Sequence, residues 1–164
     1  MNIPFHKPIL PKNLNEIYSD SIQNGWLTTG SQVKKFENKL SKYLNYRYIV
    51  ALNSCTAGLH LALAAKKFGK GDKFLAPALT FVSTIECGEY QGMRPILVDC
   101  KKNSFTMDLN FVEDAIKNEP NVKAIIPMHY GGELVDMNFL KILAEKYGIF
   151  LIEDAAHALE SSIN

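Results

Sequence analysis

The chain has 164 residues, 47% of them hydrophobic, and its formal net charge at pH 7 is +1. This length and composition are typical of one globular domain with an ordinary buried core, and they exclude a disordered chain. The near-zero charge excludes the strongly basic surface with which proteins bind nucleic acid or anionic membranes. No apolar run approaches the ~20 residues of a membrane span. We therefore expect neither a nucleic-acid nor a membrane partner.

The cysteines and histidines predict no metal site and no disulfide framework. The three cysteines, Cys55, Cys87 and Cys100, are far apart, and none forms a CxxC pair. The four histidines lack the spacing of metal ligands. The first residues lack the basic-then-apolar order of a signal peptide. We expect a cytoplasmic protein with no bound metal.

Two amphipathic helices are predicted in the first part of the chain. Apolar residues recur at helical spacing at Leu14, Ile17, Tyr18 and Ile22, and again at Val33, Phe36, Leu40 and Tyr43. Asn13 is placed to cap the first helix, and the glycine-bounded segment 25–30 forms a loop between the two helices.

From residue 46 onward, short apolar segments alternate with helical ones. The strand candidates are Arg47–Leu52, Lys73–Ala76, Pro95–Asp99, Lys123–Pro127 and Ile149–Glu153, and the helix candidates are Thr56–Phe68, Val82–Gln91, Asn110–Asn118 and Met137–Tyr147. Such alternation predicts an α/β fold, a mostly parallel sheet with helices on both faces. We expect one domain, with N-terminal helices over 1–45 and the strand–helix core over 46–164.

In open α/β sheets, ligands bind beyond the carboxyl ends of the strands, so the turns there hold the candidate site residues. The turn Asn53–Thr56 opens a helix, and its free N–H groups favour a phosphate, although Ser54 or Thr56 can equally be an ordinary cap. Phe81 can stack on a flat ring or belong to the core. His129 can touch a ligand or be a hydrogen-bonded structural histidine. No GxGxxG follows the first strand candidate, which disfavours a dinucleotide site.

The turn after the last strand candidate, Glu153-Asp154-Ala155-Ala156-His157, carries the most information. A carboxylate that leaves a buried strand among small residues suits a cationic ring nitrogen. The alternative is that Asp154 caps a following helix. A serine hydrolase is disfavoured because the motif GxSxG is absent.

The order of these segments resembles the DegT/DnrJ/EryC1/StrS sugar aminotransferases, which have the fold-type I architecture and use pyridoxal 5′-phosphate. The resemblance runs from Ile3 to about Ala158. Its motifs are the segment 25–30 with Phe36-Glu37, the turn 53–56, Gly71-Asp72, Thr80-Phe81, Pro95 with Asp99, the segment 127–131 and the segment 153–157. Within the family the chain is most similar to enzymes that aminate 4-keto nucleotide sugars, such as those that make UDP-4-amino-4-deoxy-L-arabinose.

The resemblance implies a role for each matching residue. Asp154 corresponds to the carboxylate that pairs with the protonated ring nitrogen, and His157 to the residue near the phenolic oxygen. Phe81 corresponds to the aromatic ring that stacks on the cofactor. Cys55 and Thr56 correspond to the phosphate-binding turn, with Ser83 and Thr28 nearby.

The resemblance also implies what these residues lack. Family members are more than twice as long, and the lysine that binds the cofactor covalently follows a serine downstream of the segment that matches 153–157. Glu160 stands where the family usually has glycine. We therefore expect the large domain to be incomplete, the small domain to be absent, and the chain alone to be inactive. The substrates implied by the family are a nucleotide sugar and an amino-acid donor.

Three interpretations stay open: a fragment of an aminotransferase, a non-catalytic module that binds a phosphate or a nucleotide sugar, and a subunit completed by a separately encoded second half. The family's large-domain sheet has the strand order 3-2-4-5-6-7-1, and our five strand candidates match its first five strands. We therefore expect a gap between Arg47–Leu52 and Ile149–Glu153. Direct pairing of these two segments, a homo-oligomer, or a complex with the missing half would close it.

Overall fold

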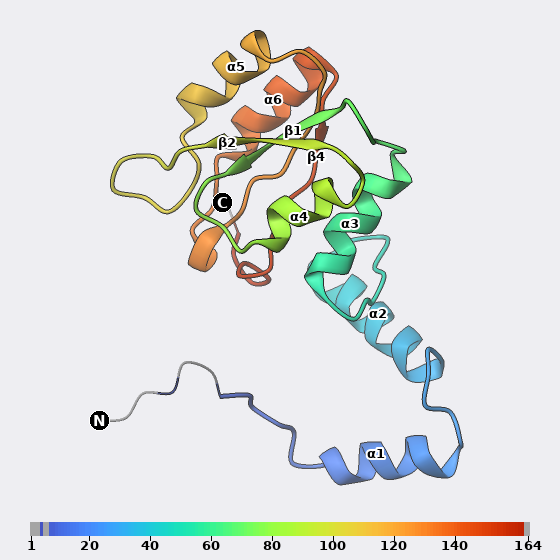
Figure 1. Cartoon of the computed structure of the whole chain (residues 1–164). Helices are drawn as coiled ribbons and strands as arrows, with labels where there is room; N and C mark the ends of the chain where they lie inside the picture. Colours follow the sequence, from blue (N-terminus) through green and yellow to red (C-terminus); the bar gives the residue numbers. More distant parts are fainter. Residues whose placement is uncertain (1–3, 5–6, 163–164) are drawn as a thin grey trace. The chain divides into compact units, whose positions relative to one another are not determined.

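The structure, a computed structural model, describes Pro4 and residues 7–162. Ile3, where the resemblance begins, lies outside the described residues. The chain divides into two compact units, Met1–Ala51 and Leu52–Asn164, and each is described by itself below (Figure 1). No helix of the described part is both long and apolar enough to cross a membrane.

The first unit contains both predicted helices, α1 (Leu14–Gln23) and α2 (Ser31–Leu44). Asn13 occupies the N-cap position of α1, but its side chain makes no capping hydrogen bond, so this part of the prediction is wrong. In the loop between the helices, the indole of Trp26 donates a hydrogen bond to the carbonyl of Thr29 at 2.9 Å. Thr28, in the same loop, is exposed.

The predicted strand Arg47–Leu52 does not form. The segment is irregular, and Tyr48 and Val50 are 78% and 74% exposed. The N–H of Ala51 donates to the Glu37 carboxylate at 2.9 Å rather than to a neighbouring strand. An extended segment is stable as a strand only when a hydrogen-bonded neighbour is present, and the described residues supply none for this one. The sheet of the described residues does not include this segment, so the direct pairing with Ile149–Glu153 that would close the gap is not found there.

The second unit is built on a four-stranded parallel sheet in the order β2-β1-β3-β4. Its strands are β1 (Lys73–Pro77), β2 (Arg94–Val98), β3 (Val122–Ile125) and β4 (Phe150–Leu151). These are the remaining four predicted strands, and their parallel pairing is confirmed. The order also agrees with the family order 3-2-4-5.

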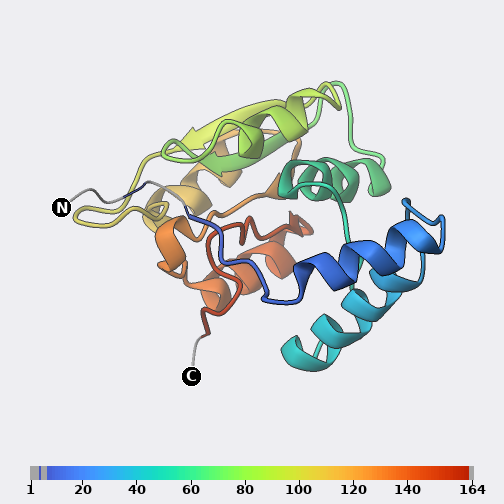
Figure 2. The ribbon, with the colours of Figure 1, turned by 90° about the horizontal axis from the view of Figure 1, so that it is seen from below.

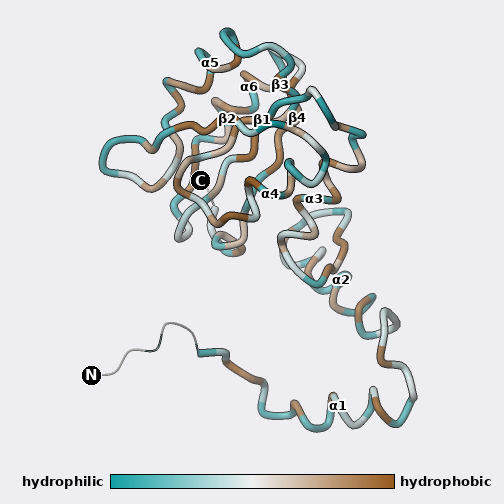
Figure 3. The backbone as a smooth tube through the Cα atoms, viewed as in Figure 1, coloured by the Kyte–Doolittle hydropathy of each residue, from teal (hydrophilic) through white to brown (hydrophobic). Residues whose placement is uncertain are grey.

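Helices cover both faces of this sheet, as predicted (Figures 1 and 2). Helices α3 (Cys55–Ala65) and α4 (Ser83–Glu89) cover one face, and α5 (Leu109–Asn118) and α6 (Met137–Tyr147) cover the other. Side chains alternate along β1: Phe74 and Ala76 pack against α3 and α4, whereas Leu75 packs with the α5 and α6 side. Figure 3 shows the apolar segments concentrated around the strands between these helices.

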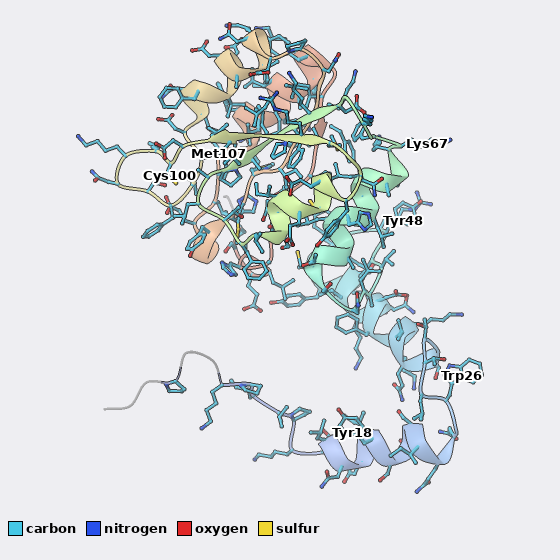
Figure 4. All side chains as sticks on the ribbon, in the orientation of Figure 1. Tyr18, Trp26, Tyr48, Lys67, Cys100 and Met107 are labelled. Atoms are coloured by element: carbon cyan, nitrogen blue, oxygen red, sulfur yellow. The ribbon has the colours of Figure 1, made fainter. Side chains whose placement is uncertain are left out.

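Local signals in the sequence explain where the helices begin. The side chains of Ser54, Asp108 and Asp136 each accept a hydrogen bond from a first-turn N–H of α3, α5 and α6, respectively. Between β2 and α5 the chain makes a hairpin, closed by an antiparallel bridge between Cys100 and Met107 (Figure 4). A short 3-10 turn, η1 (Tyr130–Gly132), follows β3.

Candidate cofactor site

Asp154 lies at the carboxyl edge of the sheet, where the β3–β4 ladder continues past both strands. Its N–H donates to the carbonyl of Pro127 at 2.9 Å, and its carbonyl accepts from the N–H of His129 at 3.1 Å. Met128 and Asp154 form an isolated parallel bridge. The backbone of Asp154 is therefore fixed by the sheet itself, at the edge where ligands of open α/β folds bind.

The carboxylate of Asp154 is buried, with only 2% of the residue exposed, and it accepts three hydrogen bonds. Its Oδ2 accepts from the Thr84 hydroxyl at 2.6 Å. Its Oδ1 accepts from the N–H of Ala156 at 3.3 Å and from the thiol of Cys55 at 3.7 Å. The residues after Asp154 form a turn and not a helix, so Asp154 does not cap one.

This carboxylate has no cationic partner among the residues that the structure describes. The ion pairs found there involve other acids: Glu113, Glu119 and Glu153. A buried charge is costly unless it is paired. The buried, unpaired Asp154 carboxylate therefore fits a cationic ligand group, such as the protonated ring nitrogen of pyridoxal phosphate, at the position predicted for it.

Cys55 and Thr56 form the first turn of α3, directly after the Ser54 cap. The Ser54 side chain accepts from the N–H of Ala57 at 3.1 Å, so Ser54 is the ordinary helix cap that the sequence allowed. First-turn N–H groups have no acceptor within their own helix, and they favour a phosphate. Partial burial, with the nearby Asp154 carboxylate as a second cause, raises the pKa of the Cys55 thiol. Cys55 therefore stays a neutral thiol donor to Asp154 at neutral pH.

Phe81 and Ser83 follow β1 at the same edge of the sheet. Phe81 is 66% exposed, so it is not a core aromatic residue and its ring is accessible to a ligand. Ser83 is buried at the start of α4. Phe81 is therefore free to act as the predicted stacking ring, whereas Ser83 lies behind the surface.

His157 lies three residues after Asp154 and its ring is held in place. Its Nδ1 accepts from the N–H of Gly131 at 3.2 Å, and the ring packs edge-on against Tyr130 with the centroids 5.6 Å apart. Because Nδ1 is the acceptor, the neutral ring carries its proton on Nε2. That N–H is a donor suited to a phenolic oxygen.

His129 is a structural histidine, the second of its two possible roles. The ring is buried, its Nδ1 accepts from the N–H of Val135 at 3.2 Å, and its Nε2 lies 3.0 Å from the Glu153 carboxylate. Nε2 therefore donates to Glu153. This hydrogen bond lowers the pKa of Glu153. With both nitrogens satisfied, His129 links Val135 to Glu153, the residue directly before Asp154.

Sequence reasoning missed Thr84 and Thr80 as site residues. Thr84 is completely buried, and its hydroxyl lies 2.7 Å from that of Thr80. The available signal was the spacing of four residues, which places two side chains on one face of a helix, although Thr80 itself precedes α4. Among Pro4 and residues 7–162, no cluster of His, Cys, Asp and Glu side chains is suited to a metal ion.

Comparison with known proteins identifies the family. A model of the DegT/DnrJ/EryC1/StrS aminotransferase family matches residues 8–164. The chain belongs to this family. It is 36% identical, over 157 residues, to the spore coat polysaccharide biosynthesis protein SpsC of Bacillus subtilis. The match covers 96% of this chain and 40% of SpsC.

Solved structures agree with this assignment. Spr1654 of Streptococcus pneumoniae, described as a sugar aminotransferase and solved in its PMP form, superposes with a TM-score of 0.89 at 32% identity, covering 96% of this chain and 43% of that one. NtdA of Bacillus subtilis with bound cofactor PMP gives a TM-score of 0.85 at 31% identity, covering 90% and 33%. The fold is thus that of fold-type I aminotransferases, and the chain spans about 40% of the length of SpsC.

Proposed function

We propose that residues 52–164 supply the ring-binding and phosphate-binding side of a pyridoxal phosphate site in a nucleotide-sugar aminotransferase of surface polysaccharide biosynthesis. The observation that carries this proposal is the buried Asp154 carboxylate, which has no cationic partner in the described part of the chain. Family membership, the PMP bound to NtdA and the polysaccharide role of SpsC support the reaction class.

When bound, the cofactor supplies the electron sink for amino-group transfer. In this proposal Asp154 holds the ring nitrogen in its protonated form, because an adjacent opposite charge favours the cation. Phe81 stacks on the ring, and the Nε2–H of His157 donates to the phenolic oxygen. The first-turn N–H groups of Cys55 and Thr56, with the Thr56 hydroxyl, bind the phosphate. Ser83 contributes to the wall behind it.

A chain of residues 1–164 alone is proposed to bind without turnover. None of its lysines follows the family's serine motif, so no lysine is positioned to bind the cofactor or to move the substrate proton. Stand-alone binding of a phosphate or nucleotide sugar, and completion of the site by a second chain, are the alternative functions. An assay with keto sugars and glutamate or glutamine should give no product, and turnover that survives stringent purification contradicts this proposal.

Titration with pyridoxamine 5′-phosphate tests the site, because this form of the cofactor binds without a lysine. Asp154→Asn should weaken its binding by roughly tenfold or more, as expected for loss of a hydrogen bond between charged groups. Asp108→Asn is the matched control: it removes the same charge at the cap of α5 and should leave binding unchanged. Inorganic phosphate should compete. Equal binding by Asp154→Asn and the unsubstituted chain contradicts the proposal.

A further inference from the structure

Two threonine hydroxyls form a chain of hydrogen bonds that ends at the carboxylate of Asp154. The Thr84 hydroxyl, on a residue with no exposed surface, lies 2.6 Å from Oδ2 of Asp154. The hydroxyl of half-buried Thr80 lies 2.7 Å from that of Thr84 and 2.9 Å from the sulfur of Met128. The relay, defined as Thr80, Thr84 and Asp154, joins the end of β1 and the start of α4 to the end of the β4 ladder.

The number of hydroxyl protons fixes which residue donates and which accepts in each hydrogen bond of this relay. An ionised carboxylate only accepts hydrogen bonds, so the single proton of the Thr84 hydroxyl is donated to Asp154. The oxygen of Thr84 can then only accept from Thr80. The Thr80 proton is thereby used as well, so the Met128 sulfur can only share it as a second, weaker acceptor. Both hydroxyl dipoles therefore point toward the carboxylate and stabilise its negative charge.

The two oxygens of Asp154 are held unequally. Oδ2 is engaged by the short bond from Thr84, whereas Oδ1 has only long bonds, 3.3 Å from the N–H of Ala156 and 3.7 Å from the thiol of Cys55. The first of these bonds is long and the second comes from a thiol, which is a weak donor, so both are easily exchanged for a better donor. Oδ1 is thus the oxygen open to a ligand, and the Thr84 bond keeps the carboxylate from rotating about its terminal torsion.

We propose that Thr84, backed by Thr80, is a positioning residue of the cofactor site: it fixes Oδ2 of Asp154 so that Oδ1 meets the ring nitrogen. This inference rests on the proposed function, because it assumes that a ring nitrogen binds at Asp154. Thr84 itself contacts no ligand. Its effect on binding passes through one atom of the cofactor, and this gives the experiment its selectivity.

The test compares two probes on three chains. The probes are pyridoxamine 5′-phosphate and its 1-deaza analogue, in which C–H replaces the ring nitrogen. The chains are the unsubstituted one, Thr84→Val, which keeps the shape and loses the hydroxyl, and Thr84→Ser, which keeps the hydroxyl. Thr84→Val should weaken the binding of pyridoxamine 5′-phosphate about tenfold and leave the binding of the analogue unchanged. Thr84→Ser should retain most of the affinity of the unsubstituted chain.

The outcomes of this comparison separate positioning from a merely structural role. An equal loss for both probes means that Thr84 only maintains the pocket and overturns the inference, as does the absence of any loss. Should Thr84→Val fail to fold, Thr80→Val, which removes only the outer hydroxyl, decides instead. A smaller loss confined to the probe with a ring nitrogen supports the relay, and no such selectivity overturns it.

A readout without any cofactor keeps this inference separate from the proposed function. If the unsubstituted chain does not bind pyridoxamine 5′-phosphate, the proposed function fails, and a double-mutant cycle of Thr84→Val and Asp154→Asn in urea unfolding then tests the relay alone. Each substitution should shift the unfolding midpoint, and the double variant should shift it by clearly less than the sum. Additive shifts overturn the relay, because two side chains that share a bond do not act independently.

Discussion

Two glycines in the neighbouring helices α3 and α4 should respond in opposite ways to the same substitution. In Gly88→Ala the new methyl would lie 2.2 Å from the Phe74 ring, whereas in Gly58→Ala it would lie 3.6 Å from the Leu52 side chain. Neither glycine has a positive φ. The difference between the two sites is therefore the space next to each glycine.

The magnitudes follow from that space. Alanine is favoured over glycine in a helix by up to ~1 kcal/mol, and Gly58→Ala meets only an ordinary contact, so it should stabilise by about 0.5–1 kcal/mol. At Gly88 the Phe74 ring must move by about 1 Å or more to relieve the contact, yet Phe74 has no exposed surface and α4 packs on it. Overpacking of this kind costs about 1–3 kcal/mol, so Gly88→Ala should be destabilising on balance.

Urea unfolding followed by circular dichroism measures both effects on the same chain. Since Gly88 belongs to the helix that carries Thr84, Gly88→Ala should also weaken the binding of pyridoxamine 5′-phosphate, and Gly58→Ala should not. Phe74→Leu in the Gly88→Ala background makes room for the methyl and should recover part of the loss. A Gly88→Ala chain as stable as Gly58→Ala would refute this reasoning, because the Phe74 contact would then have no energetic consequence.

Two further predictions concern pH and assembly. A hydrogen bond from Lys146, with a second one from Tyr147 as the next largest cause, lowers the pKa of Glu113 to about 2. The stabilisation by Glu113 is therefore complete above its ordinary pKa near 4.5 and is lost as pH falls through about 2. Glu113→Gln should lower the urea midpoint at pH 6 and lose this effect at pH 2, and an equal effect at both pH values contradicts the assignment. Separately, β4 has a hydrogen-bonded neighbour only on the β3 side in the described residues, and open strand edges promote association. Residues 1–164 should therefore sediment as an oligomer or bind a chain that carries the rest of the family's sheet, and a lone monomer with that edge exposed contradicts this expectation.

The alternation of short apolar segments and helices by itself determined much of the second unit. Strands β1 to β4 and all four of their helices lie within a few residues of their predicted positions. These elements are specified locally, by apolar periodicity and by capping side chains such as Asp136 and Ser54. The turn that carries Asp154 could likewise be placed at the carboxyl edge, because parallel strands all end on the same side of the sheet.

The predicted strand Arg47–Leu52, which does not form, shows the limit of what local sequence signals specify. Tyr48 and Val50 are residue types that favour strands, and the segment also matches the family's first strand in chain order. A strand nevertheless needs a neighbour to accept its hydrogen bonds, and this segment is not part of the sheet that the described residues form. Pairing is a property of the assembled sheet, and the sequence of one segment does not encode it.

The partners of Asp154 were likewise decided only by the tertiary structure. The sequence placed a carboxylate at the edge and a cysteine at the start of α3, but these residues are 99 apart, and Thr84 is 70 residues from Asp154. The sheet brings the three together because β1 is hydrogen-bonded to β3, and β3 to β4, which aligns the ends of segments far apart in the chain. Residue types and their order therefore indicated the chemistry of the site, whereas the bonds that orient its central carboxylate depend on distances that only the folded sheet sets.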